Sequence, residues 1–393
     1  MNAELFSVVK EIVAKHGDKI LADPRRVSAF LADMAQDVPK PQKNALKKCL
    51  DQGFGQILKN ATEAERVKCK QELAQKLHED EGFDLALCEE TLELLAVVLI
   101  GDEKVTEIKE SAFSGKQLTS FTIPDGVTAI GKNAFSHNQL TSLNIPDSVT
   151  TIGEMAFSHN QLTSITIPKK LTTIAKSAFS ENQLTSVIIS KNVSAIGDSA
   201  FLKNQLTSLN IPNSVTTIGD YAFSDNQLTS IAIPNSVTSI GNSAFSENQL
   251  TSVIIPKIVT TIGNFAFSQN QLTSIAIPNS MTTIEGYAFS KNLLASITIP
   301  NGVTIIKHGV FFENHLTSVI IPNSVTSIDR SAFCGNLINN ITIGADVELG
   351  GLWKIGAESY KRDAFDREFD GFYEKHGRKA GTYIFGIGGW KIK

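Results

Sequence analysis

The feature that most constrains this chain is a 22-residue sequence that recurs from about Val105 to Ile343. A clear copy, LTSLNIPNSVTTIGDYAFSDNQ, occupies residues 206–227, and neighbouring copies differ from it at few positions. A fixed period of about 20 to 29 residues is typical of solenoids, in which each coil buries its apolar side against the next. Eleven phenylalanines mark the period here: Phe113, Phe135, Phe157, Phe179, Phe201, Phe223, Phe245, Phe267, Phe289, Phe311 and Phe333. The sequence therefore predicts a solenoid of about eleven coils.

Each copy predicts one strand, a turn and a short return segment. Leu206, Leu209 and Ile211 form the pattern L-x-x-L-x-I, whose apolar residues point into the coil. Pro212 is expected to end the strand, because it has no N–H for the next ladder bond. The β-branched run that follows is too short for a helix. We therefore expect an extended piece that closes in a single 3₁₀-like turn at the recurring Ala-Phe pair.

Two ladders of side chains are expected inside the coils. Each phenylalanine would stack on the phenylalanine of the next coil, so that removal of one ring costs about 3–5 kcal/mol. An asparagine also stands two residues before each leucine, where a buried amide can satisfy backbone groups of the turn. These asparagines are Asn138, Asn160, Asn182, Asn204, Asn226, Asn248, Asn270, Asn292, Asn314 and Asn336.

The repeat resembles the BspA-type (Treponema-type) leucine-rich repeat, with the pattern LxxIxIPxxVxxIGxxAF. The sequence departs from that pattern where Asn-Gln replaces the usual cysteine region, and its period is one residue shorter. The resemblance implies a leucine-rich-repeat solenoid that serves as a binding scaffold. For several family members it also implies a surface adhesin that attaches to host matrix proteins or other cells. A shared fold is a weaker guide to function than to architecture.

The sequence outside the repeats predicts two further domains in an α+β chain. Residues 1–101 read as an all-helical module, residues 102–344 as the solenoid, and residues 345–393 as a small β-rich cap. Apolar periodicity predicts helices over these segments: Leu5–Val13, Asp23–Met34, Leu46–Leu58, Ala64–Leu77 and Leu85–Leu99. In the cap, aromatic residues alternate around Tyr383, Phe385 and Trp390 with glycines between them. This pattern favours a hairpin that closes the last coil.

Composition argues against several classes of partner and compartment. The chain is 42% hydrophobic and 19% charged, with a formal net charge of −4, so we expect no nucleic-acid binding. The N-terminal MNAELFSVVKEIVAKHGDK lacks the apolar core of a secretory signal, and no run of 18 apolar residues follows. We therefore expect no membrane insertion and a cytoplasmic location. Display on the cell surface, or secretion by a non-classical route, stays open as the alternative.

No constellation of residues predicts catalysis, so the chain is expected not to be an enzyme and to need no cofactor. Four cysteines, Cys49, Cys69, Cys88 and Cys334, have no metal-ligand spacing and are expected to be reduced. His137 and His159 share a register and could in principle share a metal ion. A solvent-facing turn is the stronger interpretation, because the same position elsewhere holds Glu181, Lys203, Asp225, Glu247, Gln269 and Lys291.

The exposed side of the strands is the candidate binding surface. After a recurring Thr-Ser pair, one outward position per coil varies in residue type, and we call these positions the strand face. They are Thr122, Asn144, Thr166, Ile188, Asn210, Ala232, Ile254, Ala276, Thr298 and Ile320. Such faces suit extended partners. Alternatively, threonine and serine serve only β propensity and solubility, or the threonine ladders form a flat ice- or glycan-binding surface.

These observations predict a non-enzymatic scaffold that binds a protein partner through the strand face. The alternative function is a cell-surface adhesin of the BspA type, whose partner would be a host extracellular matrix protein or another cell.

Overall fold

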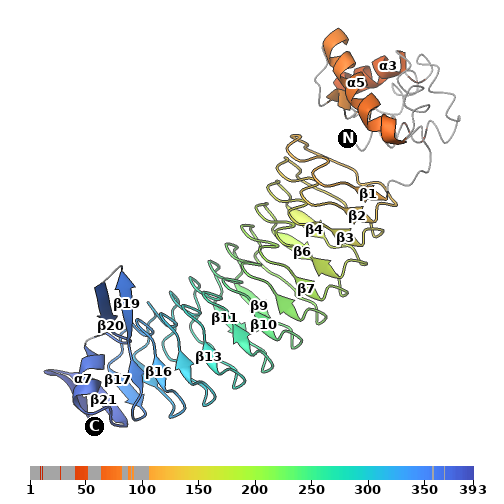
Figure 1. The fold of residues 1–393 in the computed structure, drawn as a ribbon. Helices are drawn as coiled ribbons and strands as arrows, with labels where there is room; N and C mark the ends of the chain where they lie inside the picture. The colour runs from red at the N-terminus through yellow and green to blue at the C-terminus, as the bar shows by residue number, and fades with distance from the viewer. Residues whose placement is uncertain are drawn as a thin grey trace. The chain divides into compact units, whose positions relative to one another are not determined.

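The computed structural model describes most of the repeats and the cap, and parts of the N-terminal region (Figure 1). The described residues are 9, 11, 27, 40–51, 63–81, 87–89, 91–92, 106–355, 358–366 and 368–393. The chain divides into two compact units. The first takes Met1–Glu107, Gly115–Val127 and Asn138–Pro146; the second takes Ile108–Ser114, Thr128–His137 and Asp147–Lys393. The predicted domain boundaries after residues 101 and 344 stay predictions.

Two helices of the first unit correspond to predicted ones. Helix α3 spans Lys40–Asp51 and helix α5 spans Glu63–Glu81. Helix α3 begins six residues before the predicted Leu46, because Pro41 fits the first helical turn, where its missing N–H is no loss. Leu46 and Leu77 are fully buried, and the Lys48 ammonium lies 2.9 Å from the Glu81 carboxylate.

The other predicted helices cannot be compared with the structure. Those over Leu5–Val13, Asp23–Met34 and Leu85–Leu99 lie outside the described residues, apart from a few helical positions within them.

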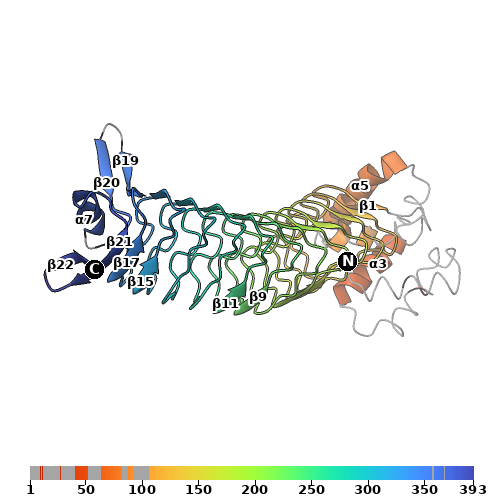
Figure 2. The same cartoon turned by 90° about the horizontal axis from the view of Figure 1, so that it is seen from below.

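The repeats form a solenoid with two rows of short parallel strands (Figures 1 and 2). The first row holds the predicted L-x-x-L-x-I strands: β4 (Ser164–Thr166), β6 (Ser186–Ile188), β9 (Ser230–Ala232), β11 (Ser252–Ile254), β15 (Ser318–Ile320) and β17 (Asn340–Ile343). The second row holds the return segments: β1 (Glu107–Ile108), β2 (Ala129–Ile130), β3 (Thr151–Ile152), β5 (Thr173–Ile174), β7 (Ala195–Ile196), β8 (Thr217–Ile218), β10 (Ser239–Ile240), β12 (Thr261–Ile262), β13 (Thr283–Ile284), β14 (Ile305–Ile306), β16 (Ser327–Ile328) and β18 (Glu348–Leu349).

The pairing register follows the sequence period. Ser239 of β10 pairs with Thr217 of β8 on one side and with Thr261 of β12 on the other, in parallel. Every copy therefore meets its neighbours at equivalent residues. In most coils Pro212 or an equivalent proline follows the first-row strand, while Ser190 and Gly344 stand at this position in two others. The Val215 amide donates to the Pro212 carbonyl at 3.0 Å to close the turn. The predicted leucine-rich-repeat solenoid of about eleven coils is confirmed.

A stack of phenylalanine rings runs through the solenoid core. Neighbouring rings from Phe113 to Phe333 are parallel or nearly so, with centroid separations of 5.2 to 6.0 Å. The stack continues into the cap, where the Phe333 and Phe365 rings lie 4.7 Å apart. The predicted ladder of rings is confirmed, and it gives the coils a shared apolar interior.

The predicted asparagine ladder is also present. The Asn226 amide nitrogen donates to the carbonyls of Phe201, Phe223 and Ser224 at 2.9, 3.2 and 3.2 Å. Its amide oxygen accepts from the Leu206 backbone N–H at 3.0 Å. One buried side chain thus satisfies backbone groups of its own coil and of the preceding one, where no water is available to do so.

The turn at the Ala-Phe pair differs from the predicted 3₁₀ form. Tyr221 has φ of 56°, in the left-handed region, whereas 3₁₀ helices need negative φ. Two backbone hydrogen bonds from residue i+3 to residue i form the turn. The Ala222 amide donates to the Gly219 carbonyl, and the Ser224 amide donates to the Tyr221 carbonyl. A left-handed residue other than glycine costs about 1–2 kcal/mol. A bond to the next coil, from the Tyr221 amide to the Asn242 carbonyl at 2.7 Å, helps to offset this cost.

The cap closes the last coil with strands, as predicted, and adds a helix that was not predicted. Its elements are β19 (Gly351–Ile355), β20 (Glu358–Arg362), α7 (Phe369–Lys375), β21 (Gly381–Gly386) and β22 (Gly389–Ile392). Strand β21 pairs antiparallel with β17 and continues into a hairpin with β22. The reversed direction ends the parallel ladder, whose open edge would otherwise invite pairing with another chain.

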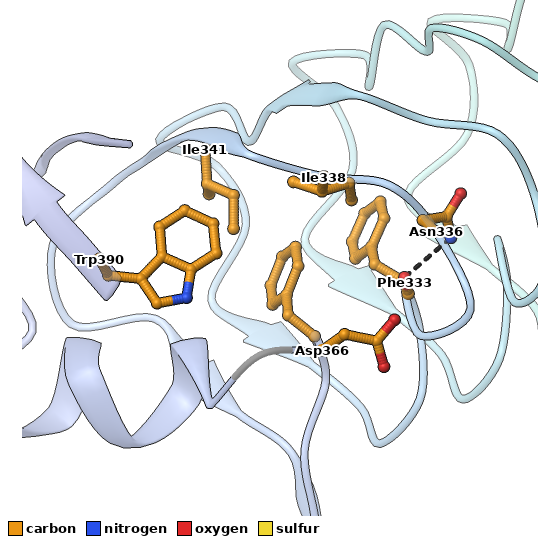
Figure 3. A pocket seen from close by; sticks show the side chains of 7 residues that line it. Phe333, Asn336, Ile338, Ile341, Asp366 and Trp390 are labelled. Atoms are coloured by element: carbon orange, nitrogen blue, oxygen red, sulfur yellow. Dashed lines mark hydrogen bonds between the residues drawn. The ribbon is translucent and has the colours of Figure 1, made fainter. Parts of the chain in front are cut away.

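Aromatic packing fixes this cap on the final coil. Figure 3 shows Trp390 near Ile341 and shows Ile338 beside the Phe333 ring, with Asn336 bonded to the Phe333 carbonyl at 2.8 Å. The cavity among these side chains holds about 10 Å³, which is room for about one water molecule. The space is therefore part of the core and too small for a ligand.

Candidate functional site

The structure places the strand face where the sequence predicts it, toward solvent. Thr122 is partly exposed, and the other nine positions are exposed: Asn144, Thr166, Ile188, Asn210, Ala232, Ile254, Ala276, Thr298 and Ile320. Their strand neighbours Ile165, Ile231 and Val253 are buried, so the alternation that the repeat predicts is observed.

Three isoleucines stand out on the strand face. Ile188, Ile254 and Ile320 have exposed fractions of 66%, 79% and 66%, and they lie on β6, β11 and β15. Each is three coils from the next, and each pairs with a smaller residue, such as Thr166 beside Ile188 and Ala232 beside Ile254. Apolar side chains therefore protrude at regular intervals from a surface whose other members are polar or small.

The threonines of the Thr-Ser pairs have a structural role. The hydroxyls of Thr185 and Thr251 donate to the carbonyls of Thr163 and Thr229 on the preceding coil, at 3.2 and 3.4 Å. A hydroxyl that donates to its own backbone ladder is no longer available to donate to a ligand. The variable positions therefore offer more for recognition than these threonines do.

The two histidines that share a register lie side by side. The His137 and His159 rings stack with centroids 4.2 Å apart, and the His159 Nδ1 atom lies 3.1 Å from the Glu181 carboxylate. Both side chains are exposed, in the turn that also holds polar residues in other coils. Across the described residues, no group of three or more metal-ligating side chains has the arrangement that a metal ion needs.

Two of the described cysteines, Cys49 and Cys334, are not activated thiols. Cys49, Cys88 and Cys334 carry no disulfide. Burial raises the pKa of Cys49 to about 12, and burial together with the nearby Asp366 carboxylate raises the pKa of Cys334 to about 12. A nucleophilic cysteine needs a lowered pKa, so neither thiol has the environment of a catalytic one.

Sequence reasoning missed a second surface, which lies along the second strand row. There an open groove of about 660 Å³ follows Gly197, Gly219, Gly241 and Gly263 and ends at Glu285. The exposed Phe265 directly follows Asn264, which lines the groove. The available signal was that one register holds glycine in these four coils, while the register two residues later alternates between serine and aromatic residues, as Ser199, Tyr221, Ser243 and Phe265.

The described helices give no sign of a membrane segment. None of the helices in the described part of the chain has the length and apolar character that crossing a bilayer requires. The predicted compartment stays a prediction.

Solved structures of bacterial repeat proteins are similar to the repeats. A leucine rich cell surface protein from Faecalibacterium prausnitzii A2-165 is 29% identical, with a TM-score of 0.41, and the match covers 61% of this chain and 83% of that one. A leucine-rich repeat protein from Bacteroides ovatus ATCC 8483 is 24% identical, with a TM-score of 0.49 and coverage of 61% and 67%. One from Eubacterium ventriosum ATCC 27560 is 22% identical, with a TM-score of 0.38 and coverage of 64% and 82%. A comparison with curated proteins found no match.

A match to a family model assigns the repeats to a protein family. The model for the BspA type leucine rich repeat region, in six copies, matches residues 106–229 and 216–342. The two matches together span more than half of the 393 residues and contain the phenylalanine and asparagine ladders described above. This chain belongs to the BspA-type leucine-rich repeat family.

Proposed function

We propose that the chain is a non-enzymatic scaffold that binds a protein partner through the strand face. The observation that carries the proposal is the regular exposure of Ile188, Ile254 and Ile320 on a face with few charges. Burial of an isoleucine side chain in an interface gains about 1.5–3 kcal/mol, so a partner that covers all three side chains gains from each of them.

The spacing of the isoleucines favours a partner of protein size. Parallel strands lie about 4.8 Å apart, so three coils separate Ile188 from Ile254 by about 14 Å. The distance from Ile188 to Ile320 is therefore about 29 Å, which exceeds the reach of a small molecule. An extended protein surface can contact all three side chains together with the polar positions between them.

We expect the triple variant Ile188→Asp, Ile254→Asp and Ile320→Asp to keep its fold and lose its partner. Each aspartate removes the apolar contact and introduces a charge that the partner must desolvate, so affinity should fall at least about tenfold. Stability should change by only about 0.5 kcal/mol per site, since all three side chains are exposed. Quantitative affinity capture with the full chain, compared with the triple variant, measures the loss.

A photo-crosslinking residue locates the contact directly. Placed at Ile254 it should form adducts with the partner, whereas at Ile258, an exposed isoleucine outside the strand face, it should form none. Unchanged capture by the triple variant, or equal crosslinking from both positions, would contradict the proposal.

Family membership supports a second candidate function, attachment to host matrix proteins or to other cells. Protease treatment of intact cells separates the candidates. An adhesin displayed outside should be cleaved, and an internal scaffold should be protected until the cells are lysed.

A further inference from the structure

The groove along the second strand row has a floor of backbone. A Cβ atom on Gly241 would lie 2.5 Å from the Gly219 carbonyl carbon, and one on Gly263 would lie 2.6 Å from the Asn242 nitrogen. Neighbouring coils therefore approach too closely for a side chain at these two glycines. In the next coil the same register holds Glu285, whose side chain lies at the end of the groove.

A ladder of polar side chains forms one edge of the groove. The Asp220 carboxylate accepts from the Asn242 backbone N–H at 2.7 Å and from its side-chain amide at 3.0 Å. The Asn242 side-chain oxygen accepts in turn from the Asn264 backbone at 2.9 Å and from its side-chain amide at 3.1 Å. These bonds fix the side chains in place. A carboxylate has about four acceptor sites and an amide four hydrogen-bonding sites, so capacity for a ligand remains.

Aromatic rings adjoin this polar ladder. Phe265 directly follows Asn264, has an exposed fraction of 42%, and stacks on Tyr287 with centroids 4.8 Å apart. The Tyr287 ring meets the His308 ring edge to face at 5.1 Å. The polar ladder and the aromatic rings meet at Gly286. A Cβ atom on Gly286 would lie 3.0 Å from the Asn264 side-chain oxygen and 2.7 Å from the His308 ring. We call Phe265, Tyr287 and His308 the aromatic ledge.

Two adjacent coils with an aromatic residue at this register occur once in the sequence, at Phe265 and Tyr287. Tyr221 also stands at this register, between coils that hold serine, and serine stands at residues 111, 177, 199, 243 and 331. Gly309 stands at this register in the next coil and leaves space for the Tyr287 ring, because the Cβ atom of any larger residue at 309 would clash with that ring. Burial lowers the pKa of His308 and so keeps its ring neutral. The stacked pair of Phe265 and Tyr287 thus lies next to Asn264 of the polar ladder.

We propose that the groove and the aromatic ledge together bind a neutral polysaccharide chain. A hexose ring has an apolar C–H face, which fits an aromatic ring, and a rim of hydroxyls, which fits carboxylate and amide side chains. The coil spacing of about 4.8 Å is close to the length of one hexose unit, so successive sugars could meet equivalent groups on successive coils.

Charge excludes the acidic polysaccharides. In the described chain, the residues that line the groove include Asp198, Asp220 and Glu285 and no lysine or arginine. A uronic acid or sulfated sugar that lies in the groove would meet these like charges, since the nearby cations Lys307 and Arg330 act at His308, in the aromatic ledge, and not in the groove lining. This surface is separate from the strand face, so the inference does not depend on the proposed protein partner.

Affinity electrophoresis of the full chain tests the proposal. The gels contain a soluble α-glucan, a β-glucan, a galactomannan or a xyloglucan, with polygalacturonate as the acidic control. We expect retardation by at least one of the neutral polysaccharides and none by polygalacturonate. Mobility unchanged in all four neutral gels, or retardation by polygalacturonate alone, would overturn the proposal.

Variants then assign the binding to the site. Phe265→Ser with Tyr287→Ser places the residue that other coils hold at this register, and should weaken binding about tenfold. Met155→Ser places serine at the same register in a distant coil and should leave binding unchanged. Ser239→Phe, within β10, should block the groove and abolish retardation even if the double variant folds poorly. Binding by Ser239→Phe equal to that of the unaltered chain would count against the groove.

Discussion

Replacing Phe223 with alanine is expected to lower the free energy of unfolding by about 3–5 kcal/mol. The ring is fully buried, and its centroid lies 5.5 Å from the rings of both Phe201 and Phe245. Its removal leaves a cavity that those rings cannot fill, because each is held at its own coil by backbone bonds such as that from the Phe245 amide to the Ala266 carbonyl at 2.9 Å. Urea unfolding followed by circular dichroism measures the loss.

The loss of stability should be concentrated in the coils around the replaced ring. In a solenoid each coil contacts mainly its neighbours, so a gap in the middle weakens the coupling between the two halves. Hydrogen exchange should therefore show faster exchange in the coils around Phe223 than at Phe157. Tyr221→Ser is the matched control, since Tyr221 is half exposed and its register holds serine elsewhere. A loss below about 1 kcal/mol for Phe223→Ala would show that the ring stack does not stabilise the array.

The repetition of the sequence explains why the core could be predicted from it. An identical environment recurs at each copy, so the phenylalanine and asparagine registers can be assigned to the interior by their period alone. Outward positions such as Ile188 follow from the alternation within each strand. The same reasoning placed His137 and His159 next to each other before their stacking was seen.

Structural features that depend on contacts between coils could not be predicted from the sequence of one copy. The left-handed conformation of Tyr221 and its counterparts is unusual for residues other than glycine, and local propensity favours a different turn. Bonds between coils make this conformation favourable, as described above. Helix α7 is likewise fixed by contacts distant in sequence, since the Tyr373 hydroxyl donates to the Gly344 carbonyl and accepts from the Val347 amide.

The groove is a candidate site that could not be predicted from one copy of the repeat for the same reason. Each glycine of its floor looks like a turn residue within its own copy, and Phe265 looks like a substitution on an exposed turn. Only the stacking of coils brings Asn264, Gly286 and His308 together. A comparison of residue types along each register, from coil to coil, is therefore a better search for sites in such chains than the analysis of one copy.

Replacing Asn226 should be nearly as damaging as removing a core ring, through hydrogen bonds instead of volume. Asn226→Ala leaves the Leu206 N–H and the carbonyls of Phe201 and Phe223 without this partner in a buried place. Each unsatisfied buried group costs about 1–3 kcal/mol, so we expect a total of about 2–5 kcal/mol. Urea unfolding at neutral pH gives this value.

Asn226→Asp distinguishes lost hydrogen bonds from lost volume, because the two side chains are almost the same size. The carboxylate keeps the bond from Leu206 but turns a negative charge toward the carbonyls of Phe201 and Phe223, so its pKa in the folded chain should rise above the unfolded value. A raised pKa means that the folded state binds the proton more tightly, and the variant should regain stability as the pH falls toward 4. Asn213→Asp is the control, since its register is exposed and already holds Asp147 in another coil. If both variants lost equal stability at pH 7 and neither regained it at low pH, the amide donor would not be what holds the coils together at this position.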